Sequence, residues 1–379
     1  MSTPRPRMYL SPPSMSEFEV EAAVTAIRSG WVAPLGPEVD GFEAEICAFT
    51  SVPHAVALAS GTAAIHLGLK ALGVEPGQDV LVPTLTFGAT AFAVTYAGAH
   101  PVFLDVEETS WNLDPQVLRE TLVERARKNA LPAVILPVDL FGRTCDYASI
   151  VALAHEFEVP ILEDAAEALG ASHGSTSAGS FGRAAVFSFN GNKIMTTGGG
   201  GMFVTDDKTL ADKVRFWSTQ SREPLPWYQH EEIGYNYRLS SVLAAIGRAQ
   251  LRRLPAMITR RREILAQYSR NLGIHDGVSL IQDPPWGRGN SWLTNVRFDL
   301  VRHPDAPELV RLALESENIE SRPVWKPMHQ QPVFKGAECH LTGAADRIFA
   351  DGLCLPSGAD MTDADIDLVS QIVVATLRR

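Results

Sequence analysis

Residues 188–201 read SFNGNKIMTTGGGG and place one lysine, Lys193, between a strand that ends in a hydroxyl-bearing residue and a run of four glycines. Upstream, the segment VPILEDAAEALG (159–170) puts Asp164 at the end of an apolar strand. A lysine amine can form an imine, a carboxylate can hold a protonated pyridine nitrogen, and small residues leave room for a phosphate. Together these features predict a site for pyridoxal 5′-phosphate (PLP).

Both residues also have ordinary structural interpretations. An aspartate at a strand end commonly caps the helix that follows, and AAEALG (165–170) could be such a helix. A lysine beside glycines is more often solvated in a hairpin than buried in an active site. Each signal is weak alone, and their order along one chain makes the stronger case.

Length and composition limit the class of protein. The chain has 379 residues, which favours two domains, and its formal net charge of −11 argues against a nucleic-acid-binding protein. Its four cysteines form no CxxC pair, so we expect reduced thiols and no metal site. The first 15 residues lack the apolar core of a signal peptide, and no apolar run approaches the ~18 residues of a membrane span. A cytoplasmic location, away from membranes, is therefore expected.

Apolar runs alternate with helical patterns over the first half of the chain. Strands are predicted at 54–58, 79–82, 101–105, 133–138 and 160–163, and helices at 61–73, 89–99, 115–128 and 147–157. This order predicts an α/β fold with a mostly parallel sheet flanked by helices. Residues 184–189 and 201–205 flank the lysine loop and predict a hairpin added to that sheet.

The last third of the chain has a different pattern. A long helical stretch covers 240–272 and contains Pro255, where we expect a break or a bend. Beyond it, strands at 292–299 and 319–324 and helices at 307–317 and 364–377 suit a smaller α+β domain. We therefore predict a large α/β domain with an N-terminal arm at 1–255 and a small C-terminal domain at 256–379.

Several polar and aromatic residues follow strands of the predicted sheet, where ligands gather in open α/β folds. Ser60, Gly61, Thr62 and Ala63 open a helix, whose free N–H groups and dipole suit a phosphate. The alternative is a simple helix cap by Ser60 or Thr62. Phe87 could stack on a flat ring, although an aromatic residue there is more often part of a core.

Five motifs occur in an order that resembles a known family. They are SGTAAIHL (60–67), EDAAEALG (163–170), FSFNGNKIMTTGGGG (187–201), YNYRLSSVLAAIGRAQ (235–250) and SRPVWKPMH (321–329). Over nearly its whole length the chain resembles the DegT-type, PLP-dependent nucleotide-sugar aminotransferases of fold type I, in the aspartate aminotransferase superfamily. The stretches GNKI (191–194), STQSRE (218–223) and CLPSG (354–358) look closest to enzymes that aminate C4 of UDP-4-keto-6-deoxy-N-acetylglucosamine in bacillosamine biosynthesis.

The resemblance implies a role for each matching residue. Lys193 would bind PLP as an imine and then move the proton, and Asp164 would pair with the pyridine nitrogen. The phosphate would be bound by backbone N–H groups of Thr62 and Ala63 and by the hydroxyl of Ser188, and Phe87 would cover the ring. Asn236 would reach the phosphate from a second subunit, so the resemblance implies a homodimer. Glutamate would be the amino donor.

The resemblance also implies a place for the substrate and shows one departure. The matching nucleotide-sugar contacts are Gly30, Trp31, Val32 and Ala33 and, in the second stretch, Trp325, Lys326, Pro327, Met328 and His329. Glu167 stands where many relatives have His or Gln near the phenolic oxygen of the cofactor. Because two adjacent anions repel, Glu167 should be protonated there or turned away.

Several alternatives remain open at this stage. A C3 aminotransferase, or one acting on a dTDP- or GDP-linked sugar, would share the same motifs. PLP-dependent sugar 3-dehydratases carry His at the lysine position, so Lys193 disfavours them. A regulatory protein that keeps the fold without turnover is a further alternative. A dinucleotide-binding α/β enzyme would need a G-x-G-x-x-G sequence after the first strand, and none is present.

Overall fold

The computed structural model describes residues 5–378, and its centre is a sheet built from two four-stranded parts. The strand orders of the two parts are β1–β9–β8–β5 and β14–β3–β2–β4. Their bounds are β1 (His54–Leu58), β2 (Asp79–Pro83), β3 (His100–Leu104), β4 (Val134–Ile135), β5 (Leu162–Asp164), β8 (Ala184–Ser188), β9 (Gly201–Thr205) and β14 (Cys339–His340). Parallel bridges Ile135↔Ile161 and Val138↔Asp164 join the two parts. Only the pairings of β9 are antiparallel among these strands, so the predicted mostly parallel sheet is confirmed.

The predicted hairpin around the lysine loop is confirmed, but it lies inside the sheet. Strand β9 pairs with β8 on one side and with β1 on the other, in the registers Ser188↔Gly201 and Leu58↔Gly201. The end of β8, the start of β9 and the end of β1 therefore meet at one edge of the sheet. The lysine loop and the segment that follows β1 start from this point.

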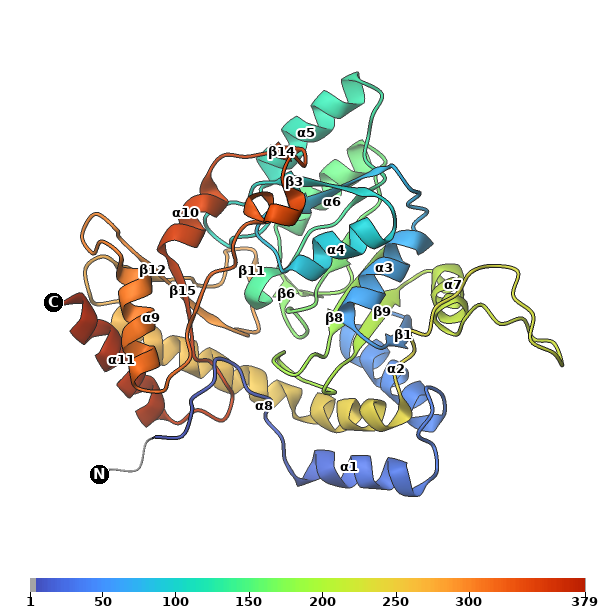
Figure 1. Cartoon of the computed structure of the whole chain (residues 1–379), viewed down its shortest axis with the longest axis horizontal. Helices are drawn as coiled ribbons and strands as arrows, with labels where there is room; N and C mark the ends of the chain where they lie inside the picture. Colours follow the sequence, from blue (N-terminus) through green and yellow to red (C-terminus); the bar gives the residue numbers. More distant parts are fainter. Residues whose placement is uncertain (1–4, 379) are drawn as a thin grey trace.

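Helices cover both faces of the sheet because residues along each strand alternate in direction. Val56 and Val82 face a core formed with α3 (Gly61–Ala71), α4 (Gly88–Tyr96) and α7 (Lys208–Ser218). Ala57 faces the other side, toward α2 (Pro37–Thr50) and α8 (Ser241–Leu272), and Leu81 faces α5 (Pro115–Arg127) and α6 (Tyr147–Glu156). This layering is visible in Figure 1. Within the described range, no helix is both long and apolar enough to cross a membrane.

Helix α8 links the large sheet to a second, antiparallel sheet. It runs as one helix through Pro255, so the expected break is absent. Proline removes one backbone donor there, while Leu254, Met257 and Ile258 bury the helix against the core on both sides of the site. Figure 1 shows α8 lying along the base of the molecule, with α1 (Glu17–Arg28) beneath it.

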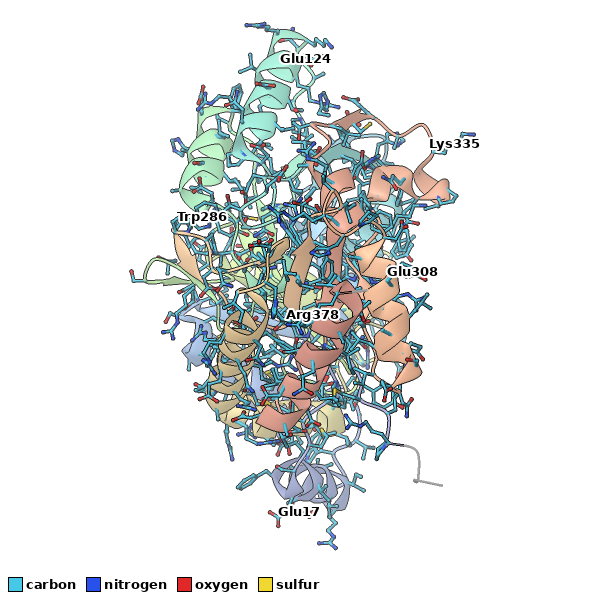
Figure 2. All side chains as sticks on the ribbon, turned by 90° about the vertical axis from the view of Figure 1, so that its left-hand side faces the viewer. Glu17, Glu124, Trp286, Glu308, Lys335 and Arg378 are labelled. Carbon is cyan, nitrogen blue, oxygen red and sulfur yellow. The ribbon has the colours of Figure 1, made fainter. Side chains whose placement is uncertain are left out.

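The second sheet has the strand order β10–β12–β15–β13 and forms its own core. Its elements are β10 (Val278–Leu280), β12 (Thr294–Phe298), β13 (Arg322–Pro323), β15 (Gly352–Leu355), α9 (Ala306–Ser316) and α11 (Asp363–Leu377). Figure 2 views the molecule from this side, with Glu308 on α9 and Arg378 after α11 toward the viewer. The N-terminal arm crosses to this unit through the bridge Met8↔Ile319. We keep the division into 1–255 and 256–379 as a proposal.

A buried carboxylate at the end of β3 fastens the C-terminal part of the chain to the large sheet. Asp105 is fully buried and accepts the N–H groups of Thr342, Gly343, Ala344 and Ala345 at 2.7, 2.7, 3.1 and 2.9 Å. These groups open α10 (Ala344–Asp351), whose dipole also favours an anion. Burial alone would raise the pKa of Asp105, but the donors, led by Ala345, outweigh it and lower that pKa.

We predict that Asp105→Asn lowers the free energy of unfolding by about 2 to 3 kcal/mol at pH 7, because an amide nitrogen would face N–H donors. The lowered pKa stabilises the fold above the ordinary carboxyl range, so the loss should shrink as the pH falls below about 4. Urea unfolding at several pH values measures both effects. The control is Asp114→Asn, which keeps a good cap at the start of α5 and should cost less than about 0.5 kcal/mol. Equal losses in the two variants would contradict the assignment.

Candidate active site

A cavity of about 340 Å³ lies where β1, β2, β5 and β8 end. Its lining comprises Ser60, Gly61, Thr62, Ile65, Thr86, Phe87, Ala89, Thr90, Val138, Asp164, Ala166, Glu167, Ser188, Asn190, Asn192, Lys193, Gly199, Gly200, Trp292 and Trp325. The predicted site residues Thr62, Phe87, Asp164, Glu167 and Lys193 are among them, together with Ser188 and Trp325. Segments far apart in the sequence thus meet at the carboxyl ends of the strands, as the parallel topology requires.

One wall of the cavity is formed by three backbones that approach closely. A Cβ on Gly61 would lie 2.9 Å from the Cβ of Ser188, and one on Gly201 would lie 2.6 Å from the nitrogen of Gly61. Glycine is needed at both positions because any side chain would separate α3 from the ends of β8 and β9. At Gly199 an added Cβ would meet nothing within 4 Å, so this part of the glycine run borders open space. Gly61 and Gly201 therefore allow the backbones to pack closely, whereas Gly199 leaves open space beside the cavity.

The start of α3 presents hydrogen-bond donors to the cavity. Ser60 caps the helix, and its hydroxyl accepts the N–H of Ala63 at 3.1 Å. The N–H groups of Gly61 and Thr62 have no acceptor among residues 5–378, and neither does the hydroxyl of Ser188 beside them. Unpaired donors at a helix N-terminus form a ready-made anion site.

Asp164 ends β5 and is nearly fully buried, with 3% of its surface exposed. Its Oδ2 accepts the hydroxyl of Thr90 at 2.7 Å, and its Oδ1 accepts the N–H of Ala166 at 3.2 Å. Burial raises its pKa, and the Thr90 hydroxyl, the Ala166 N–H and the charge of Lys193 partly oppose that rise. Residues 166–170 form turns and none of residues 165–170 is helical, so Asp164 is not a helix cap. A carboxylate so placed can pair with a cationic ring nitrogen.

Lys193 and Glu167 face each other in the cavity, with Nζ and Oε1 2.9 Å apart. Their side chains are 11% and 3% exposed, so the pair is largely removed from water. Oε2 of Glu167 accepts the N–H of Phe141 at 2.8 Å, and Phe141 is in the left-handed region with φ of 54° to make this contact. Burial raises the pKa of Glu167, against the opposing effects of Lys193 and the Phe141 N–H. The carboxyl group therefore points into the cavity and is not turned away.

Aromatic side chains close the cavity opposite the sheet. Phe87 follows β2 and is 58% exposed, so it is available to stack on a ligand ring. The Trp325 ring lies 5.5 Å from Phe87 and 4.8 Å from Phe141, measured between centroids. Its loop is fixed to the end of β2, because Thr84 accepts the N–H of Met328 at 2.7 Å through its carbonyl and contacts Nδ1 of His329 at 2.7 Å.

The cavity fits pyridoxal phosphate. Unpaired donors at Gly61, Thr62 and Ser188 suit the phosphate, and Asp164 suits the ring nitrogen. The amine of Lys193 lies on the same cavity, and exposed Phe87 offers a flat apolar surface. When bound, the cofactor would act as an electron sink for the carbon that loses a proton.

Other predicted residues lie apart from this cavity within the chain. The N–H of Ala63 is taken by Ser60, and Asn236 is exposed beside α7. Gly30, Trp31, Val32 and Ala33 are exposed in the link between α1 and α2. Lys326 borders a neighbouring cavity of about 780 Å³, which shares Asn192, Trp292 and Trp325 with the first. Pro327 starts a short turn in which Met328 is buried, and Nε2 of His329 pairs with Asp346 at 3.0 Å. These assignments remain predictions.

Sequence reasoning missed three residues that the structure brings to the site. Thr90 supports Asp164, Phe141 supports Glu167, and Trp292 lies with its ring centroid 4.4 Å from Nζ of Lys193. Thr90 follows Phe87 by one helical turn, which could have signalled a shared face. Phe141 and Trp292 carry no local signal, since their roles arise from contacts between distant segments.

Comparison with known proteins agrees with this site. Residues 13–374 match the DegT/DnrJ/EryC1/StrS aminotransferase family. EpsN of Bacillus subtilis, a proposed pyridoxal phosphate-dependent aminotransferase, is 43% identical over 97% of this chain and 95% of its own length. GDP-perosamine synthase of Caulobacter vibrioides is 36% identical over 96% of each chain. DesI, solved in the presence of its TDP-sugar product, is 29% identical with a TM-score of 0.89, covering 100% of this chain and 94% of DesI.

The family match and the cofactor-shaped cavity lead to one assignment. The chain belongs to the DegT/DnrJ/EryC1/StrS aminotransferase family and is a PLP-dependent sugar aminotransferase of fold type I.

Proposed function

We propose that this enzyme moves an amino group from glutamate to the 4-keto carbon of a UDP-linked 6-deoxy-N-acetylhexosamine, giving a 4-amino sugar for glycan biosynthesis. The observation that carries the aminotransferase chemistry is the amine of Lys193, which shares one cavity with Asp164 and the donors of α3. The choice of UDP and of C4 rests on the motif resemblance at 191–194, 218–223 and 354–358.

The alternatives differ in how much supports them. The relatives named above include a GDP-perosamine synthase and a protein with a TDP-sugar product, so a GDP- or dTDP-linked substrate is the leading alternative. A C3 aminotransferase of the same family is a further one. A non-catalytic regulatory protein has less support, because the amine, the carboxylates and the anion site are all in place.

In this proposal each residue acts on a defined atom or group. Lys193 would move a proton from the α carbon of the amino donor to the cofactor and, in the second half of the reaction, from the cofactor to the sugar carbon. Glu167 would hold the amine of Lys193 in place. Asp164 would keep a positive charge on the ring nitrogen, because its buried carboxylate lies on the cavity at the end of β5. Thr62 and Ser188 would bind the phosphate with their unpaired donors, whereas Ala63 would contribute only if its N–H left the Ser60 cap, and Phe87 would cover the ring. A cytoplasmic location remains a prediction.

The 4-amino transfer is tested with a panel of substrates. The enzyme is incubated with glutamate and with UDP-, dTDP- and GDP-linked 4-keto-6-deoxy sugars and 3-keto sugars, and the products are identified by NMR. We expect the highest kcat/KM for the UDP-4-keto-6-deoxy-N-acetyl sugar, with 2-oxoglutarate as the second product. A higher kcat/KM for a GDP- or dTDP-linked sugar, or amination at C3, would contradict the proposed substrate and leave the family assignment intact.

We predict that Lys193→Ala lowers turnover by more than about 10³-fold, because it removes both the amine that would bind the cofactor and the group proposed to carry the proton. The variant should still bind PLP through the phosphate but lack the visible absorbance of lysine-linked cofactor. Lys335→Ala is the control, since Figure 2 shows Lys335 at the edge of the molecule. Turnover of Lys193→Ala near the level of this control would contradict the assigned role.

We also propose a homodimer in which Asn236 completes the phosphate site of the second subunit. Between α7 and α8 the chain extends away from the body, as Figure 1 shows. Trp227, Tyr228 and Ile233 on this extension are 60%, 77% and 84% exposed, which is unusual for large apolar side chains in a monomer. Asn236 lies at its base and is exposed outside the cavity of its own chain.

The shared site predicts complementation between two inactive variants. Lys193→Ala and Asn236→Ala subunits, each carrying a different affinity tag, are co-expressed and the mixed dimers are purified through both tags. Each mixed dimer would hold one complete site, so we expect about half of the wild-type activity per dimer. No recovery in mixed dimers of normal stability would show that Asn236 does not act across the interface.

A further inference from the structure

Trp292 lies beside the amine of Lys193, although no sequence motif points to it. Its ring centroid is 4.4 Å from Nζ, within the range of a cation–π contact. The side chain is 1% exposed and belongs to the lining of both cavities, so it forms part of the partition between them. This buried indole therefore differs from an ordinary core residue, because one face of its ring contacts the Lys193 amine.

The orientation of this indole is fixed from several sides. The backbone N–H of Trp292 donates to Asn290 Oδ1 at 2.9 Å, and its carbonyl accepts from Arg261 at 2.5 Å. Its ring N–H donates to the carbonyl of Asn192, the residue before Lys193, at 2.7 Å. Ser11 of the N-terminal arm donates to the same carbonyl at 2.8 Å. The tryptophan therefore holds both the backbone and the amine of the lysine loop.

The charges around the amine explain why an aromatic face suits this position. Glu167 contacts Lys193 from one side, and Asp164 also acts on it from the end of β5. Arg143, which is 3% exposed, lies close enough for the charge of Glu167 to act on it. A third carboxylate would attract the ammonium but would repel Glu167 and Asp164. The ring face attracts the ammonium without adding a charge to a buried site.

We propose that Trp292 is a positioning residue for Lys193, whose ring face keeps the protonated amine beside Glu167 whenever the amine is not bonded. The ring therefore fixes the position of the Lys193 amine between one proton transfer and the next. This inference rests on the proposed role of Lys193 but needs neither the proposed sugar nor the dimer. It predicts that weakening the ring face makes the neutral, nucleophilic amine more abundant at a given pH.

The reactivity of Lys193 with trinitrobenzenesulfonate tests this prediction without substrate or turnover. The full-length protein is freed of cofactor, and labelling of Lys193 is followed by peptide mass spectrometry from pH 6 to pH 11, with Lys335 as the internal reference. Only the neutral amine reacts. The pH at which the labelling rate is half-maximal therefore reports the charge state of Lys193, and the maximal rate at high pH reports how accessible its amine is to the reagent. For Trp292→Leu we expect the half-maximal pH to fall by about half a unit, equivalent to about 3-fold faster labelling at neutral pH.

Fluorinated tryptophan at position 292 is the sharper variant, since it keeps the shape and the ring N–H while removing negative charge from the ring face. Incorporated by nonsense suppression, it should lower the half-maximal pH further with each added fluorine, even if Trp292→Leu fails to fold. Trp292→Phe should shift less than Trp292→Leu, and Trp325→Leu should not shift. In the enzyme with bound PLP, the midpoint of the pH titration of the visible absorbance should also shift with fluorination.

The outcomes are distinguishable from those of the functional proposal. A half-maximal pH that is unchanged by fluorination would overturn the role of the ring face, and so would equal shifts for Trp292→Phe and Trp292→Leu. A fluorine-dependent shift supports it whatever nucleotide sugar the enzyme prefers. Failure of the substrate panel would leave this result standing, because labelling requires only the chain itself.

Discussion

The close approach of three backbones at Gly61, Ser188 and Gly201 is the constraint on which the site depends. A Cβ at Gly61 would lie 2.9 Å from Ser188, so α3 can begin beside the end of β8 only if that residue has no side chain. The same approach aligns the free N–H groups of Gly61 and Thr62 with the hydroxyl of Ser188. It also places β9 between β8 and β1, which turns the lysine loop over the edge of the sheet. The anion site and the amine are therefore consequences of one packing arrangement.

Around that arrangement the protein buries several ionisable groups, and their charges nearly balance. Burial raises the pKa values of Asp164 and Glu167 and lowers the pKa of Arg143 to about 10. Isolated buried charges are costly, so each of these groups has a polar partner or lies within reach of an opposite charge. Lys193 contacts Glu167 and interacts with Asp164 through its charge, which offsets the cost of burying an amine whose side chain is 11% exposed. Bound PLP would add a cationic ring and an anionic phosphate to this nearly balanced set of charges.

The sequence was sufficient to predict the site residues at strand ends and helix starts, but not those brought to the site by packing between separate segments. Strand ends such as Asp164 and helix starts such as Ser60 carry local signals, because alternating apolar runs fix where each strand stops. Helices α1 and α2 were not predicted, and Pro255 did not break α8, since tertiary burial on both sides outweighed the lost donor. The contacts of Phe141 and Trp292 had no local signal at all. They exist only because the fold brings together segments that are 26 residues apart for Phe141 and Glu167 and 100 residues apart for Trp292 and Asn192.

Two aromatic residues of the cavity lining come from the C-terminal part of the chain, although the rest of the lining lies between residues 60 and 200. Trp292 and Trp325 reach the cavity from segments that flank the second sheet, while Asp105 and Thr84 bind the C-terminal segments to the strand ends of the first. Arg261 on α8 adds a third link through the carbonyl of Trp292. Because the Thr84 and Arg261 links end within a few residues of the cavity lining, movement of the second sheet relative to the first would change the distance between the aromatic residues and Lys193. The shape of the active site is thus set by the same contacts that join the two halves of the fold.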